Sequence, residues 1–156
     1  MTDKAREPLS TEEILALLPQ QRPFRFIDEI IELDDAHIVS TYTFRNDEFF
    51  YLGHFPGNPI TPGVILLETV AQTGVVAHGI YLASKQMSMD EIQRTLTLFT
   101  EANVEFTGMV KPGDKVIIRA KKVYFRRLKL KSEVELSLTD GTVVCSGTIA
   151  GMGVQL

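Results

Sequence analysis

The chain has little cysteine, and no internal repeat or linker is visible in it. Cys145 is the only cysteine, so no disulfide can form within one chain, and we expect its side chain to be a small core residue. The first eight residues form a short, charged segment, and no apolar segment typical of a signal peptide follows them. No low-complexity stretch interrupts the 156 residues. We therefore expect one domain, residues 1–156, located in the cytoplasm.

Charge is nearly absent from one long segment. Between residues 55 and 84 the only charged side chain is Glu68, and apolar residues occupy all sides of the helix predicted for residues 62–84, with Thr61 as its N-cap. Such a helix lies either in a protein core or in a membrane. The longest uncharged piece, residues 69–84, is shorter than the roughly 18–20 residues that a span needs. This favours a core helix wrapped by a sheet, with no membrane insertion.

The rest of the chain predicts strands around this helix. Ser10 and Glu13 form a capping-box pattern, which predicts a short helix over residues 9–19. Alternating or β-branched segments predict strands over residues 24–33, 37–44, 96–106, 114–123, 128–138 and 142–149, and a helical turn begun at Ser88 precedes the third. Strands, one long helix and then a meander indicate an α+β fold with an antiparallel sheet.

Glu68 is the polar exception inside the apolar helix. A buried carboxylate needs a partner or stays protonated, and Gln72, four residues on, lies on the same helix face. A structural polar pair would explain these two residues. The helix follows a Gly- and Pro-rich loop that carries His54, however, and a buried acid near a histidine is typical of a matched acid/base pair.

Residues 53–72 read G-H-F-P-G-N-P-I-T-P-G-V-I-L-L-E-T-V-A-Q. This stretch resembles the FabZ-type 3-hydroxyacyl-[acyl-carrier-protein] dehydratases, whose pattern is close to G-H-F-P-G-x-P-x-x-P-G-V-x-x-x-E-x-x-A-Q. Weaker similarity extends to residues 17–28, 110–114 and 140–145, so the resemblance covers nearly the whole chain. It implies a hot-dog fold, in which a long central helix is wrapped by a curved antiparallel sheet.

The resemblance also implies an assembly and an activity. Two protomers form a double hot dog, the histidine of one meeting the acid of the other, and a trimer of such dimers is a family expectation. The related FabA-type enzymes carry Asp at the position of Glu68, so Glu68 places the chain on the FabZ side, which favours plain dehydration over additional isomerisation.

The resemblance assigns roles residue by residue. His54 removes a proton from C2 of the 3-hydroxyacyl thioester, and Glu68 protonates the departing hydroxyl or holds the water that does so. Gly63 and Val64, at the positive end of the helix, contact the substrate, with the Gly63 N–H on the thioester carbonyl. Gln72 orients Glu68. We expect no metal and no cofactor other than the phosphopantetheine arm of the acyl carrier protein that bears the substrate.

Three departures from the family pattern concern the carrier protein and the acyl chain. The usual His-Arg pair is Gln20-Gln21 here. Glu105 and Thr107 occupy two usually basic positions, and the preceding aromatic/Gly strand reads Leu-Phe-Thr at residues 98–100. The acyl chain length therefore cannot be inferred from these motifs.

A basic stretch offers another surface for the carrier protein. Residues 111–131 hold nine basic side chains and one acid, although the whole chain has a net charge of -4. Arg127, Lys129 and Lys131 are expected on one strand face, and Arg126, Arg127 and Lys129 are the candidate docking residues. A solvated strand face is the plain alternative. Nucleic acid is disfavoured, because the chain is acidic overall and has no motif of that class.

Two other functions remain open: a hot-dog acyl-thioesterase, and an acyl-binding module without catalysis. Retention of both His54 and Glu68 argues against the module. His37 and His78 lack metal-ligand spacing to a second ligand and are expected in the core or at the surface.

Overall fold

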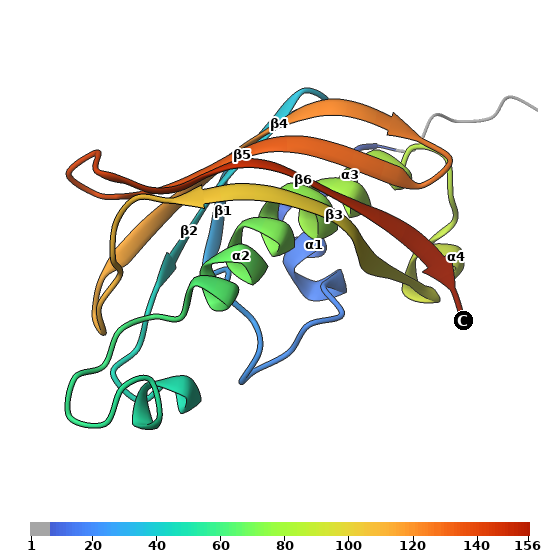
Figure 1. Cartoon of the computed structure of the whole chain (residues 1–156). Helices are drawn as coiled ribbons and strands as arrows, with labels where there is room; N and C mark the ends of the chain where they lie inside the picture. The colour runs from blue at the N-terminus through green and yellow to red at the C-terminus, as the bar shows by residue number, and fades with distance from the viewer. Residues whose placement is uncertain (1–6) are drawn as a thin grey trace, which may run out of the picture.

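A computed structural model describes residues 7–156, and it folds as a curved antiparallel sheet around one helix. The six strands are β1 (Glu29–Leu33), β2 (His37–Thr43), β3 (Thr95–Phe106), β4 (Lys115–Arg126), β5 (Lys129–Leu138) and β6 (Val143–Gln155). Their order is β1-β2-β4-β5-β6-β3, with every neighbouring pair antiparallel. Figure 1 shows the sheet arched over the central helix. The predicted α+β hot-dog architecture is confirmed.

The central helix runs through three consecutive segments: α2 (Gly63–Ala71), a π-helical segment (Gln72–Ala77) and α3 (His78–Ala83). Glycines let this helix approach the sheet closely: a Cβ on Gly151 would lie 2.5 Å from Val75 Cγ1, and one on Gly74 would lie 3.0 Å from Ala120 Cβ. The 21-residue helix is long and apolar enough to cross a membrane, but 67% of its most apolar stretch is buried. A helix buried to this extent belongs to the core of the fold.

Two short helices flank the sheet, the first where the capping box at Ser10 predicted it and the second where a helical turn was predicted to begin at Ser88. In α1 (Thr11–Leu17) the Ser10 hydroxyl accepts from the Glu13 N–H, and in α4 (Met89–Gln93) Ser88 accepts from Glu91 in the same way. Each Glu side chain accepts in return from the N-cap backbone N–H. A 3₁₀ helix (Phe49–Leu52) is the one regular turn in the described part of the loop that precedes α2.

Several predicted boundaries are wrong. The helix begins at Gly63 with Pro62 as its N-cap, rather than at Pro62 with Thr61 as the cap. Residues 24–28 form no strand, because the Phe26 N–H donates to Gln72 instead of to a neighbouring strand. β4 and β6 extend further than predicted, to Arg126 and Gln155.

The predicted cationic strand face is also wrong. Arg127 and Leu128 have φ angles of 50° and 63°, so they form the tight turn between β4 and β5. β5 begins only at Lys129, and Arg127 lies outside the strand that carries Lys129 and Lys131. The Lys131 Nζ lies 3.2 Å from Glu101 Oε1 on β3, so its charge is already paired.

Candidate active site

The loop between β2 and α2 holds the His54 ring by its backbone. The Ile60 N–H donates to the His54 carbonyl at 2.9 Å, and His54 Nδ1 lies 2.8 Å from the Ile60 carbonyl oxygen. A carbonyl only accepts, so Nδ1 carries the proton and Nε2 of the neutral ring keeps its lone pair. The Phe55 ring stacks on the imidazole with centroids 4.1 Å apart. The loop thus fixes both the tautomer and the plane of His54.

Thr61 anchors this loop to the connection between β3 and β4 and to the 3₁₀ helix. Its N–H donates to the Val110 carbonyl at 2.9 Å, and its Oγ1 lies 2.6 Å from the Tyr51 hydroxyl. Thr61 and Tyr51 are both buried. A histidine carried on a loop is positioned well only if the loop is fixed, and these two contacts fix it next to the start of α2.

Glu68 lies in the second turn of α2, where Gln72 holds it. Gln72 is 1% exposed and makes three hydrogen bonds, donating to Glu68 Oε1 at 3.0 Å and to the Phe24 carbonyl, and accepting from the Phe26 N–H at 2.7 Å. Burial raises the pKa of Glu68, and the Gln72 hydrogen bond opposes the rise. A neutral Glu68 with Oε1 facing a donor carries its proton on Oε2, where it is free to be donated.

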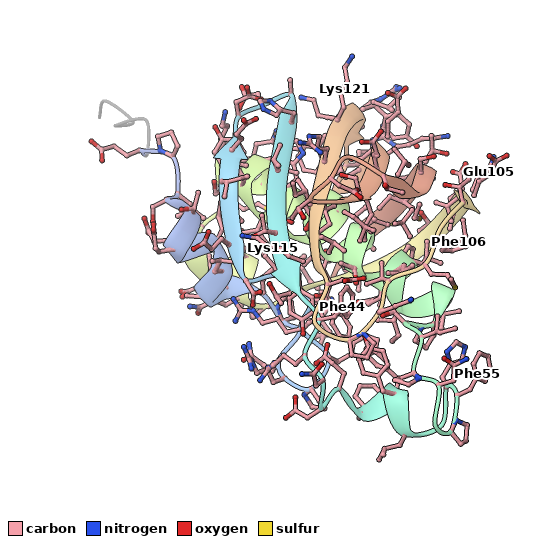
Figure 2. All side chains as sticks on the ribbon, turned by 90° about the vertical axis from the view of Figure 1, so that its left-hand side faces the viewer. Phe44, Phe55, Glu105, Phe106, Lys115 and Lys121 are labelled. Atoms are coloured by element: carbon pink, nitrogen blue, oxygen red, sulfur yellow. The ribbon has the colours of Figure 1, made fainter. Side chains whose placement is uncertain are left out.

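The start of α2 provides backbone donors. Its N-terminus has no side-chain cap, so the Gly63 and Val64 N–H groups carry the positive end of the helix dipole. The Val64 side chain is 73% exposed, whereas a Cβ on Gly63 would lie 3.4 Å from the Phe106 ring. Figure 2 shows Phe106 and Phe55 on the same side of the molecule.

Two small cavities lie along the central helix. The first, here called the Glu68 cavity, has a volume of about 40 Å³ and is lined by Gln20, Glu68, Ala71, Val75, Val76, Thr97 and Phe99. The second, here called the inner cavity, also measures about 40 Å³ and includes Ile80, Phe125 and Leu130 in a largely apolar lining. Both are lined by Val75, Val76 and Thr97, so they adjoin along one side of the helix.

The described chain does not bring His54 and Glu68 together. His54 does not line the Glu68 cavity, and within residues 7–156 the carboxyl group accepts a hydrogen bond from Gln72 alone. Gly63 and Val64 share a helix start with Glu68, and Gln72 contacts it directly. One protomer therefore supplies a histidine and an acid in separate places.

Sequence reasoning missed two contributions to this region. Gln20 lines the Glu68 cavity, although the sequence marked it only as a departure from the family pattern. The Phe24 carbonyl and Phe26 N–H hold Gln72, but backbone groups leave no signal in side-chain identity.

The other histidines and the cysteine have structural surroundings, as expected. His37 pairs with Glu32 and Asp34 at the surface, whereas His78 and Cys145 are buried. Residues 7–156 contain no group of three or more side chains placed to hold a metal ion.

The candidate docking residues lie far from the His54 loop along the strand. Val110 contacts Thr61 and the Asp114 carbonyl contacts Phe44, so β4 starts beside the loop. Its 12 residues span roughly 40 Å, which places Arg126, Arg127 and Lys129 at the other end of the sheet in the same protomer.

Comparison with known proteins adds sequence relatives. A FabA-like domain model matches residues 18–151. The chain is 36% identical over 134 residues to a 3-hydroxyacyl-[acyl-carrier-protein] dehydratase FabZ of Chloroflexus aggregans, covering 85% of this chain and 88% of the relative. It is 32% identical to the FabZ of Bartonella quintana, covering 97% and 94% of the two chains.

Solved structures share the fold at lower identity. The dehydratase heterocomplex ApeI:P from Xenorhabdus doucetiae matches with a TM-score of 0.75 at 17% identity, covering 91% of each chain. A thioesterase from Pseudomonas aeruginosa matches with a TM-score of 0.66 at 14% identity, covering 97% and 98%. At these identities the structures support the hot-dog fold alone. The domain match over most of the chain and the identities above 30% decide the family: this chain belongs to the FabA-like family and is similar in sequence to FabZ-type dehydratases.

Proposed function

We propose that this protein dehydrates (3R)-3-hydroxyacyl-[acyl-carrier-protein] to the trans-2-enoyl product in fatty acid or related lipid biosynthesis. One observation carries the proposal. The Ile60 carbonyl accepts from His54 Nδ1, which leaves Nε2 of the neutral ring available as a base, while burial raises the pKa of Glu68 and the Gln72 hydrogen bond to Oε1 leaves Oε2 free to hold the proton. A base and an acid in these states are what an elimination of water needs.

The reaction follows from these two states. His54 Nε2 takes the proton from C2, and the electrons of that C–H bond form the C2=C3 double bond. The C3–O bond breaks towards oxygen, which takes the proton of Glu68 and leaves as water. Negative charge develops on the thioester oxygen as C2 is deprotonated, and the N–H groups of Gly63 and Val64 at the uncapped helix start stabilise it.

The two cavities suit an acyl chain. They adjoin at Val75, Val76 and Thr97, and the inner cavity continues from Glu68 into an apolar lining. An acyl chain whose C3 lies at Glu68 would extend along the helix into this lining, where it gains free energy by leaving water.

A second protomer completes the site. β3 lies at the edge of the sheet and exposes Leu98, Phe99 and Phe106, while Phe55 and Val64 are exposed nearby on the loop and helix start. An apolar edge of this kind is a ready surface for pairing with another chain. We propose a homodimer in which His54 of one protomer faces Glu68 of the other, with a trimer of dimers as a further level of assembly.

The partner in catalysis would be an acyl carrier protein, whose phosphopantetheine arm brings the thioester. The thioester itself makes C2 acidic, so the chemistry calls for neither a metal nor an organic cofactor. Residues 1–156 would form one domain acting in the cytoplasm. Arg126, Arg127 and Lys129 remain the candidate docking residues. If they dock the carrier protein, reversing all three to Glu weakens carrier-protein binding and reduces its salt dependence, whereas unchanged affinity at low salt would reject this surface.

Mixing the protein with crotonyl-pantetheine thioester tests the activity. A dehydratase run in reverse hydrates the double bond, so the enoyl absorbance falls while no thiol is released. A hot-dog thioesterase, the second candidate, releases thiol instead. An acyl-binding module does neither, and either of these outcomes would overturn the proposal.

A further inference from the structure

Gln20 is a polar side chain in the Glu68 cavity that the reaction above leaves without a role. It follows α1 and lines the cavity together with Glu68. Its Oε1 is buried and has no hydrogen-bond partner in residues 7–156. The next residue, Gln21, differs: its Nε2 donates to the Leu18 carbonyl at 3.0 Å, and it does not line the cavity.

A buried acceptor without a donor is unfavourable and rare in folded proteins. Apart from Gln20, Glu68 and Thr97, the lining of this cavity is apolar. The volume of about 40 Å³ exceeds the roughly 15 Å³ that one water molecule needs. The cavity therefore has room for a small hydroxylic group between an acid and an acceptor, and few other polar side chains to hold it.

We propose that Gln20 Oε1 accepts a hydrogen bond from the oxygen that leaves C3, first as the substrate hydroxyl and then as water. This rests on the proposed dehydration. Before the reaction, the hydroxyl donates a hydrogen bond to Gln20 and accepts one from the protonated carboxyl of Glu68, whose proton passes to the oxygen as the C3–O bond breaks. The C3–O bond then breaks with its electron pair on oxygen, and the new water keeps its donation to Gln20. The C2 proton stays on His54.

This geometry orients the leaving oxygen. A hydroxyl that donates to Gln20 turns a lone pair towards Glu68 Oε2, where the proton resides because Oε1 faces Gln72. Without Gln20 the hydroxyl of the bound substrate is free to rotate, so its lone pair points at Glu68 Oε2 for a smaller fraction of the time. Gln20 therefore affects only the departure of the hydroxyl from C3, because His54 removes the proton at C2.

Two substrates separate the roles. The unmodified protein and Gln20→Leu would be compared on 3-hydroxybutyryl-pantetheine and on 3-chlorobutyryl-pantetheine, whose chloride leaves without taking a proton. We expect Gln20→Leu to lower kcat about 10-fold on the hydroxy substrate, the weight of one hydrogen bond, and less than about 2-fold on the chloro substrate. Gln20→His, which restores a hydrogen-bonding group, should recover most of the loss.

Gln21→Leu is the matched control, since it removes an amide from the same loop but not from the cavity, and it should leave the ratio of the two rates unchanged. Equal losses on both substrates in Gln20→Leu, or no loss on either, would overturn the role of Gln20. If the unmodified protein turns over neither substrate, the dehydratase proposal itself fails instead. Thermal unfolding of each variant shows whether it is folded.

Discussion

The two ends of the central helix each have a histidine tied to a backbone carbonyl. Before the helix, His54 Nδ1 lies 2.8 Å from the Ile60 carbonyl, and in α3, His78 Nε2 lies 2.8 Å from the Asp34 carbonyl. Either tie fixes a tautomer and leaves the other ring nitrogen as a base. The two sites differ in what that second nitrogen meets.

His78 is 0% exposed, and its Nδ1 has no hydrogen-bond partner in residues 7–156. Burial lowers the pKa of His78 and keeps it neutral. His54 sits on a partly exposed loop beside an uncapped helix start. A carbonyl tie therefore makes a structural histidine inside the core and a catalytic candidate at the surface, and access decides between them.

His54→Ala tests the catalytic histidine of this comparison and should have the largest effect. Removing the base should lower kcat for dehydration by about 10²–10⁴, with little change in stability. His37→Ala is the control, because His37 pairs only with Glu32 and Asp34 at the surface. Steady-state rates that stay within a few-fold of the unmodified protein in His54→Ala would remove His54 from the mechanism.

His78→Ala tests the buried, structural histidine. Its loss leaves a cavity and removes a buried hydrogen bond, so we expect the free energy of unfolding to fall by about 2–3 kcal/mol. The kcat of the folded variant should stay within about 3-fold of the unmodified protein, because His78 has no access to substrate. Urea unfolding and initial rates check the two parts.

The pH dependence of the same variant has a defined sign. The pKa of His78 is lowered from 6.5, so the folded state binds fewer protons than the unfolded one as pH falls below that value. The unmodified protein thus loses stability below about pH 6.5. The difference in free energy of unfolding between the unmodified protein and His78→Ala should therefore become smaller below that pH. A constant difference from pH 8 to pH 5 would contradict a neutral, buried His78.

Glu68→Gln should have the smallest effect on stability. The pKa of Glu68 is raised from 4.5, so stability is lost as pH rises above that value through the raised pKa. The amide of Glu68→Gln does not ionise, so the free energy of unfolding of this variant at pH 8 should exceed that of the unmodified protein by on the order of 0.5 kcal/mol. The figure is small because Glu68 is only partly buried. The variant should gain nothing at pH 4. Glu133→Gln, on an exposed residue of β5, is the control.

The sequence predicted the parts of this molecule that local rules govern. The capping box at Ser10 and the uniformly apolar helix around Glu68 were readable because cap chemistry and burial leave a pattern in the chain. The four-residue spacing of Glu68 and Gln72 predicted their pairing, which the structure contains, and the resemblance of residues 53–72 added the family.

Long-range contacts account for what the sequence did not predict. Gln72 draws the Phe26 N–H into a side-chain hydrogen bond, so the β-like residues 24–28 form no strand. Arg127 and Leu128 adopt positive φ without glycine or asparagine, so the turn carried no recognisable signal. The role of Gln20 depended on a cavity formed with β3, some 75 residues on in the chain.

Mixing two inactive variants tests the shared site most directly. His54→Ala and Glu68→Gln, unfolded and refolded together, form mixed dimers in which one of the two sites has both native residues. Random pairing then restores about one quarter of the unmodified activity, while either variant refolded alone stays inactive. If the mixture remains as inactive as its components although mixed dimers are present, then His54 and Glu68 do not act across a subunit boundary.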